Sequence, residues 1–235
     1  MRDEYISWKD WKREDFGVFT EDESRYFDWH VRRAVDKSTR KLRVLEIGFG
    51  NGGFLNWARL RGHEVTGVEL SEELVARAQV AGYRSFAATA AAGGQGAFDL
   101  IVGFDVLEHI EMSTLQTMLR DFRSQLAPEG RMLFRFPNSE SPMGVIYQNG
   151  DITHVTRLGV SSMRQICNLT GLKLLHSGDV LPWRSYPLRK RPRKMFAAVV
   201  RQYVQWILGD VMIGHPVRIA ANEVVVLGCT STPTP

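Results

Sequence analysis

Four glycines, Gly48, Gly50, Gly52 and Gly53, directly follow the short apolar segment 42–47. Glycines in such a turn can adopt positive φ and let a ligand approach the backbone closely. The helix expected after them offers its first N–H groups to an anion. The spacing Gly48-x-Gly50-x-x-Gly53 also matches the dinucleotide fingerprint. The pattern therefore indicates a nucleotide-like ligand, and an ordinary glycine turn between strand and helix is the alternative.

A carboxylate follows the next apolar segment, where Glu69 ends Val65-Thr66-Gly67-Val68-Glu69. A carboxylate at a strand end can accept hydrogen bonds from both hydroxyls of a ribose, which both NAD and S-adenosylmethionine (SAM) carry. The alternative is a solvated residue with no ligand. Glu69 is therefore the candidate residue for binding the ribose of the cofactor.

A third group of polar residues follows the strongly apolar segment 98–104. Asp105, Glu108 and His109 come within five positions of its end. Ligands of open α/β sheets bind at the carboxyl ends of the strands. These side chains are therefore expected near the glycine turn.

Strands and helices alternate from residue 41 onwards, which favours a parallel sheet with helices on both faces. Ser71 is a predicted N-cap, and Ser113 with Gln116 and Ser162 with Gln165 are predicted capping boxes. Two late strands suggest a terminal hairpin interrupted by an insertion at about 183–220. The expected strands are 42–47, 64–68, 98–104, 131–136, 172–175 and 223–227. The expected helices in this part of the chain are 54–60, 71–82, 113–127 and 162–171.

The composition is that of a folded domain: 235 residues, 44% hydrophobic, 24% charged and a net charge of +4. No run reaches the roughly 18 apolar residues of a membrane span, and the charged, aromatic N-terminus does not resemble a secretory signal. Two cysteines are too few for a disulfide framework. We therefore expect a cytoplasmic protein. Its histidines and cysteines show no metal-ligand spacing, so no metal is predicted.

Taken together, Glu46-x-Gly48-x-Gly50, Val68-Glu69-Leu70 and Asp105-Val106-Leu107-Glu108-His109 resemble the class I SAM-dependent methyltransferases. The resemblance covers about residues 41–180, and the last segment is similar to the ubiquinone-type O-methyltransferases. It implies an α/β, Rossmann-like, seven-stranded, mostly parallel sheet in the order 3-2-1-4-5-7-6. Helices would cover both faces, with a terminal antiparallel hairpin and a helical insertion.

The resemblance also implies roles for cofactor-binding residues. Glu46 and the loop Gly48, Gly50 and Gly52 would hold the methionine end of SAM, Glu69 the ribose, and Leu70 the adenine.

Phe104 and Asp105 would line the methionine and transfer site. Many relatives carry an acidic residue after the third strand that binds the adenine amine, but this chain has Phe86 followed by Ala87, Ala88 and Thr89. Thr89 or backbone groups are the expected substitutes.

Two histidines are candidates for the general base that methyl transfer to an alcohol needs, a role that contributes ~10²–10⁴-fold in rate. His109 follows Asp105, and His154 lies in the polar loop 147–156. Packing against the sheet edge is the alternative for His109. For His154 the alternative is a conformational role, tied by Asp151 or Thr153.

One segment precedes the expected methyltransferase domain, 41–235, and another is inserted in it at about 183–220. Residues 1–40 form a helical arm or lid, with a helix expected at 26–35. In the insertion, the basic run 189–194 precedes an amphipathic helix expected over 193–213. This helix would contact an anionic membrane peripherally, or pack on the domain or across a homodimer. Nucleic acid is disfavoured, because the basic charge is small and local.

The leading hypothesis is a SAM-dependent methyltransferase acting on a hydroxyl of a small-molecule, sugar or lipid-linked acceptor. The Trp-Lys-x-Trp arm, the Glu-Ile-Gly-Phe-Gly-Asn-Gly loop and the Gly-Asp-Ile-Thr-His segment resemble methyltransferases of bacterial surface-polysaccharide assembly. The alternatives are an NAD-dependent oxidoreductase and a non-catalytic SAM-binding module.

Overall fold

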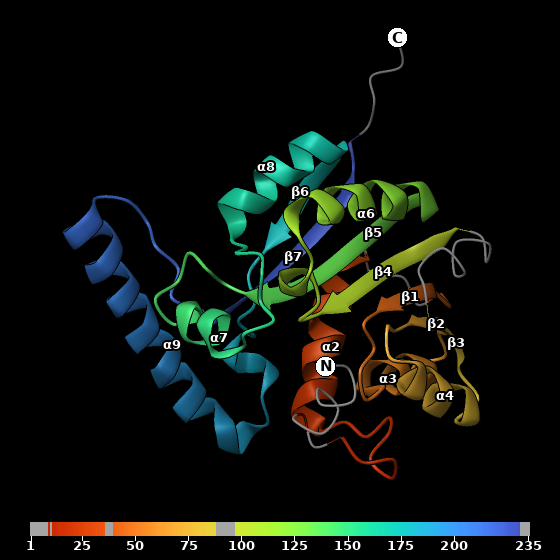
Figure 1. The fold of residues 1–235 in the computed structure, drawn as a ribbon. Coiled ribbons are helices and arrows are strands. Elements are labelled where there is room, and N and C mark those ends of the chain that lie inside the picture. The colour runs from red at the N-terminus through yellow and green to blue at the C-terminus, as the bar shows by residue number, and fades with distance from the viewer. Residues whose placement is uncertain (1–8, 10, 36–39, 88–96, 231–235) are drawn as a thin grey trace.

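The computed structural model describes residues 9, 11–35, 40–87 and 97–230. One sheet has the strand order β3-β2-β1-β4-β5-β7-β6 (Figure 1). The strands are β1 (Arg43–Ile47), β2 (Glu64–Val68), β3 (Arg84–Phe86), β4 (Phe98–Phe104), β5 (Leu126–Pro137), β6 (Leu172–Ser177) and β7 (Asn222–Cys229). Strands β1 to β5 are parallel, and β7 runs antiparallel to both β5 and β6. The predicted seven-stranded sheet and terminal hairpin are confirmed.

Helices cover both faces of this sheet, as alternation along the chain predicts. The helices in the described part of the chain are α2 (Glu21–Ala34), α3 (Gly53–Leu60), α4 (Glu72–Val80), α6 (Met112–Gln125), α7 (Gly144–Gly150), α8 (Val160–Thr170) and α9 (Arg191–Trp206). Short helical turns are η1 (Leu107–His109), η2 (Trp183–Ser185), η3 (Leu188–Lys190) and the π-helical η4 (Ile207–Ile213).

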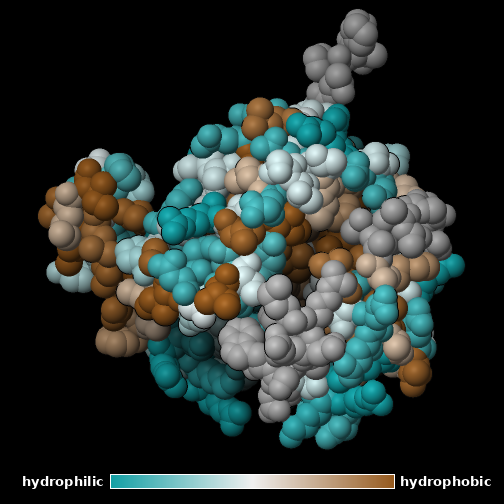
Figure 2. All heavy atoms as spheres, viewed as in Figure 1, coloured by the Kyte–Doolittle hydropathy of each residue, from teal (hydrophilic) through white to brown (hydrophobic). Residues whose placement is uncertain are grey.

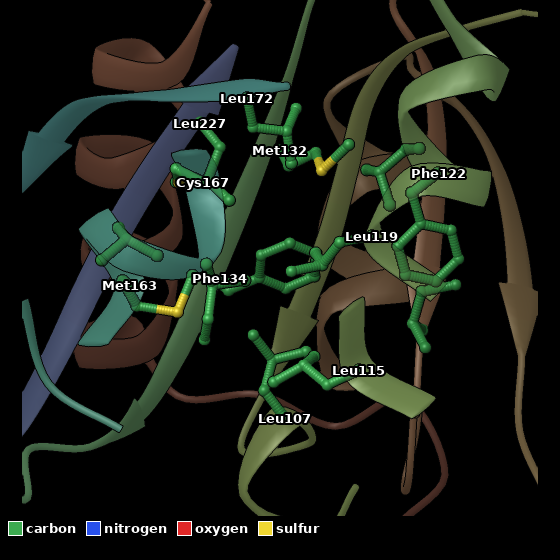
Figure 3. Packing of buried hydrophobic residues seen from close by; sticks show 14 of the residues in the cluster. Leu107, Leu115, Leu119, Phe122, Met132, Phe134, Met163, Cys167, Leu172 and Leu227 are labelled. Atoms are coloured by element: carbon green, nitrogen blue, oxygen red, sulfur yellow. The ribbon is translucent and has the colours of Figure 1, made fainter. Parts of the chain in front are cut away.

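Period-two alternation along the strands divides the core between the two faces. Phe134 packs toward α6 and α8, whereas its neighbour Leu133 packs toward α2 and α3. Figure 3 shows Phe134 surrounded by Leu119 and Phe122 of α6 and by Met163 of α8. Each such side chain contributes about 1.5–3 kcal/mol when fully buried. This packing fixes the carboxyl ends of β1, β2 and β4, where the polar residues gather.

Helix α2 begins five residues earlier than the sequence analysis predicts, because its cap was missed. The Thr20 hydroxyl accepts from the Glu23 N–H (3.1 Å), and the Glu23 carboxylate accepts from the Thr20 N–H (2.7 Å). This is a complete capping box.

Two predicted capping boxes are wrong, whereas the Ser71 cap is confirmed. Helix α6 begins at Met112, so Ser113 lies inside its first turn. Helix α8 begins at Val160, and the carboxylate of Glu140 accepts from the Ser161 N–H (2.7 Å). The Ser162 hydroxyl also accepts from the Gly159 N–H (2.8 Å), so α8 has one local cap and one from a distant loop, which a local pattern cannot indicate.

Helix α9 has an apolar stripe that the rest of the described chain does not cover. No residue of α9 is buried in the part of the chain that the structure describes. Figure 2 shows hydrophobic residues gathered over α9 at the left of the view. Its large exposed side chains are Met195, Phe196, Val199, Val200, Tyr203 and Trp206, followed in η4 by Val211, Met212 and Ile213. Among the described residues, no helix is long and apolar enough to cross a membrane.

Candidate active site

The glycine loop between β1 and α3 has a backbone that other residues rarely adopt. Gly48, Gly50 and Gly52 have φ values of 64°, 52° and 74°. A Cβ on Gly48 would lie 2.5 Å from Cγ2 of Val106. The loop therefore needs glycine for its turn, and at Gly48 also for its contact with the segment after β4.

The N-terminal arm packs directly on this loop. A Cβ on Gly50 would lie 2.7 Å from the ring of Trp11, and one on Gly52 would lie 2.6 Å from the ring of Phe16. The Trp11 carbonyl also accepts from Arg77 of α4 (3.0 Å). The lack of a side chain at Gly50 and at Gly52 thus leaves room for the rings of Trp11 and Phe16.

Glu69 turns its carboxylate toward the glycine loop from the end of β2. One oxygen accepts from the Gly50 N–H (3.1 Å) and the other from the Leu70 N–H (2.7 Å). The Leu70 side chain is 63% exposed, beside this carboxylate. A carboxylate and an exposed apolar side chain are therefore available side by side for a sugar and a base.

Glu46, the last but one residue of β1, is buried. Its Oε2 atom has no hydrogen-bond partner among the described residues. Burial, followed by the repulsion of Glu69, raises the pKa of Glu46 well above its ordinary value of 4.5. A cationic group of a ligand beside this carboxyl would satisfy the oxygen and favour its ionised form.

Asp105 has a left-handed backbone (φ 56°) directly after β4. Its carboxylate forms an ion pair with Arg135 of β5, whose Nε donates to it over 2.9 Å. The Phe104 side chain turns the other way, into the aromatic packing of Phe27 and Phe54. The Phe104 backbone, and not its side chain, is therefore the part of this residue that lies beside Asp105 at the end of β4. Thr89 falls outside the described residues.

The two predicted catalytic histidines come together although they are 45 positions apart. The ring centroids of His109 and His154 are 4.6 Å apart. His109 lies in η1, whereas His154 belongs to the loop after α7. That loop is held on η1 because the Glu108 carbonyl accepts from the N–H groups of Val155 (2.9 Å) and Thr156 (3.0 Å).

Glu108 lies between the histidines and the core, and it is fully buried. Burial, followed by the negative charge of Asp105, raises the pKa of Glu108 to about 8. His154 Nε2 lies 3.9 Å from Glu108 Oε1 and 3.8 Å from Asp151 Oδ2. Burial and the neighbouring His154 lower the pKa of His109. The site thus has two imidazoles and two carboxylates at the carboxyl end of β4.

One comparison with known proteins shows the family of this chain. Residues 19–177 match the family model described as a methyltransferase domain. This chain belongs to that methyltransferase family. No curated protein sequence matches it.

Solved structures with the fold of this methyltransferase share little sequence with it. A SAM-dependent methyltransferase from Archaeoglobus fulgidus is 16% identical, with a TM-score of 0.61 over 92% of this chain and 96% of that one. The CcbJ methyltransferase from Streptomyces caelestis is 13% identical, with a TM-score of 0.59 over 93% and 96%. The magnesium protoporphyrin IX methyltransferase of Synechocystis PCC 6803, solved with bound SAH, is 15% identical, with a TM-score of 0.58 over 97% of each chain.

The crevice of this methyltransferase fits SAM. Glu69 offers two carboxylate oxygens to ribose hydroxyls, and Glu46 has a buried oxygen without a partner among the described residues for a cationic group. Glu46, Gly48, Gly50, Gly52, Glu69, Leu70 and Asp105 are all at the carboxyl ends of β1, β2 and β4.

Sequence analysis missed several residues of this site. Arg135 was one, although a charged residue in the apolar run 131–136 is a usable signal. Gln148 was another, and its carbonyl pairs with His154 Nδ1 over 3.2 Å. Asp151 and Thr153 were considered only as anchors for His154. In the structure, Thr153 pairs with His109 instead (2.9 Å).

Proposed function

We propose that this protein transfers the methyl group of SAM to a hydroxyl of a small-molecule, sugar or lipid-linked acceptor. One observation carries the proposal: the histidine pair begins three residues after Val106, which contacts the glycine loop at Gly48. A bound cofactor and a proton-accepting group would therefore lie side by side.

In this proposal the crevice binds and orients the cofactor. Glu69 holds the ribose hydroxyls, and Leu70 packs against the adenine. Glu46 and the glycine loop hold the methionine end, with Asp105 fixed by Arg135 at its edge. SAM supplies an activated sulfonium methyl group, so what this chain must add is alignment, exclusion of water and removal of a proton.

The acceptor hydroxyl lies at His109 and His154 in this arrangement. As its oxygen attacks the methyl carbon, one of the histidines takes the proton. Thr153 and Asp151 orient His109 through a chain of hydrogen bonds, and the Gln148 carbonyl orients His154.

Thermal unfolding with SAM, S-adenosylhomocysteine and NAD tests the cofactor. Ligands that bind the folded state must raise the melting temperature. We expect shifts with SAM and S-adenosylhomocysteine only. A shift with NAD alone would restore the oxidoreductase alternative, against which family membership speaks. Binding of SAM without transfer of labelled methyl to any sugar or lipid-linked alcohol would leave a SAM-binding module.

A lipid-linked acceptor is supported by α9 and its surroundings. Between residues 184 and 194 six basic side chains occur without an acidic one, next to the exposed apolar stripe. Basic residues beside an amphipathic helix favour anionic membrane surfaces. The resemblance of three motifs to those of polysaccharide-assembly methyltransferases favours the same kind of acceptor.

Co-sedimentation tests this membrane contact. The protein should sediment with phosphatidylglycerol vesicles and not with phosphatidylcholine vesicles. Phe196→Ser with Trp206→Ser should abolish the effect. A dimer in solution that hides α9, with no vesicle binding, would support the homodimer alternative instead.

A further inference from the structure

Three side chains of the transfer site converge as ligands of a metal ion would. One ligand atom each from Glu108, His109 and His154 lies within 4.8 Å of the others. Tetrahedral ligands at about 2.1 Å from Zn²⁺ are about 3.4 Å apart. The 3.9 Å between His154 Nε2 and Glu108 Oε1 exceeds that separation by about 0.5 Å.

The Glu108 carboxylate is the second, independent observation. Its side chain is 1% exposed, and neither oxygen has a hydrogen-bond partner within the described part of the chain. A protonated carboxyl would not resolve this, because the nearest imidazole nitrogen of His154 is 3.9 Å away, beyond hydrogen-bond range. Buried charges in proteins are paired or coordinate a metal. A cation between Glu108 and the two histidines would satisfy the carboxylate.

The hydrogen bonds around the histidines also match those of metal ligands. His154 Nδ1 pairs with the Gln148 carbonyl, which can only accept, so Nδ1 carries the proton and Nε2 has the lone pair facing Glu108. The Thr153 hydroxyl donates to Asp151 over 2.5 Å, so toward His109 it acts as an acceptor. Metal-binding histidines usually donate their other ring N–H to a carbonyl or to an oxygen tied to a carboxylate.

We propose that Glu108, His109 and His154 bind a divalent first-row cation of the zinc class beside the cofactor crevice. Two imidazoles and one carboxylate are typical ligands of catalytic sites that keep a position open for substrate. The spacing in the sequence gave no indication of this site, because the ligands come from η1 and from a loop 45 positions later.

This inference rests on the proposed function and refines the part played by the histidines. The open position takes the acceptor oxygen, and the cation lowers the pKa of that hydroxyl so that its proton leaves to solvent. The oxygen then forms a bond to the methyl carbon, and the electrons of the broken C–S bond stay on sulfur. In the metal-bound enzyme His109 and His154 therefore act as ligands, and neither takes the proton itself.

The test is metal binding by the full chain, after removal of metals with a chelator. A Cys229→Ser background removes the exposed thiol as a competing ligand. Titration with Zn²⁺ and the visible absorption of Co²⁺ should both show one cation per chain. Glu108→Gln and His154→Asn should each weaken binding at least about 100-fold, and Thr153→Val about 10–100-fold.

Matched controls keep the result interpretable. Glu111→Gln and His176→Asn alter exposed side chains of the same types and should bind the cation like the parent. Burial disfavours the ionised form of Glu108 and raises its pKa, so Glu108→Gln should fold at least as stably without metal. Failure of the parent to bind a stoichiometric cation, or equal binding by Glu108→Gln, would overturn the proposal.

Two further measurements separate this inference from the proposed function. Methyl transfer that is unaffected by chelation, with SAM binding intact, would overturn the metal site and leave the methyltransferase proposal standing. Absence of SAM binding in a chain that binds one cation would overturn the proposed function and leave the metal site standing.

Discussion

The glycine loop and the histidine cluster lie next to each other, yet the chain holds their carboxylates differently. One oxygen of Glu69 accepts from the Gly50 N–H of the glycine loop, and the other accepts from the Leu70 N–H directly after β2. Both oxygens of Glu108 are buried without a partner among the described residues. The Glu69 carboxylate has partners without a ligand, whereas a bound cation would supply the partner of the Glu108 carboxylate. Cofactor binding and methyl transfer should therefore respond separately to substitution.

The largest effect should follow His154→Ala. Whether His154 acts as a base or as a metal ligand, turnover should fall by about 10²-fold or more. SAM affinity should stay unchanged, because this ring lies against His109, Glu108 and Asp151, which the proposal does not place at the cofactor. Single-turnover methyl transfer and calorimetric SAM binding measure the two separately. His176→Ala is the matched control. If His154→Ala lowered SAM affinity as much as it lowers turnover, the glycine loop and the histidine cluster would not act separately.

Glu69→Gln should show the reverse separation. It weakens the hydrogen bonds that the ribose hydroxyls donate to a charged acceptor, which are worth about 1.5–3 kcal/mol. SAM affinity should therefore fall about 10–100-fold, while transfer at saturating SAM is maintained. Glu72→Gln, an exposed carboxyl in the first turn of α4, should leave SAM affinity intact. An unaltered SAM affinity in Glu69→Gln would remove Glu69 from the cofactor site.

Gly48→Ala should weaken SAM binding about tenfold. A side chain at this positive φ costs about 1–2 kcal/mol, and its Cβ would also crowd Val106. Gly62→Ala is a sharp control, since Gly62 has φ of 81° with no atom within 4 Å of an added Cβ. Calorimetry should show weaker SAM binding only for Gly48→Ala. Equal SAM affinities in the two variants would mean that the loop has no ligand-specific role.

A smaller effect should appear in the pH dependence of stability. The folded-state pKa of Glu46 is raised, so its contribution is complete below the unfolded value of 4.5 and is lost as pH rises toward the folded value. The slope is at most about 1.4 kcal/mol per pH unit. Glu46→Gln should remove this decline in urea unfolding. SAM, as a cation beside Glu46, should bind more tightly as pH rises, and a pH-independent affinity would place its charge elsewhere.

The sheet and the cofactor crevice were predictable because their signals are local. A strand, a glycine turn and a helix follow one another at 43–60, and Glu69 ends the next strand. The short β3 and the strand order came from the family resemblance rather than from periodicity.

Contacts between distant segments account for what the sequence analysis missed. Glu140 caps α8 from a separate loop, and His109 meets His154 only because the Glu108 carbonyl holds the loop after α7. The unpartnered state of the Glu108 oxygens depends on three-dimensional packing, which no spacing in the sequence shows.

The central claim is that the adenosyl cofactor lies on the glycine loop with its ribose at Glu69. A crystal structure of the protein with S-adenosylhomocysteine tests it most directly. The account predicts both ribose hydroxyls within hydrogen-bond distance of the Glu69 carboxylate and the thioether sulfur near Asp105. A ligand bound elsewhere, with Trp11 and Phe16 filling the crevice, would contradict it.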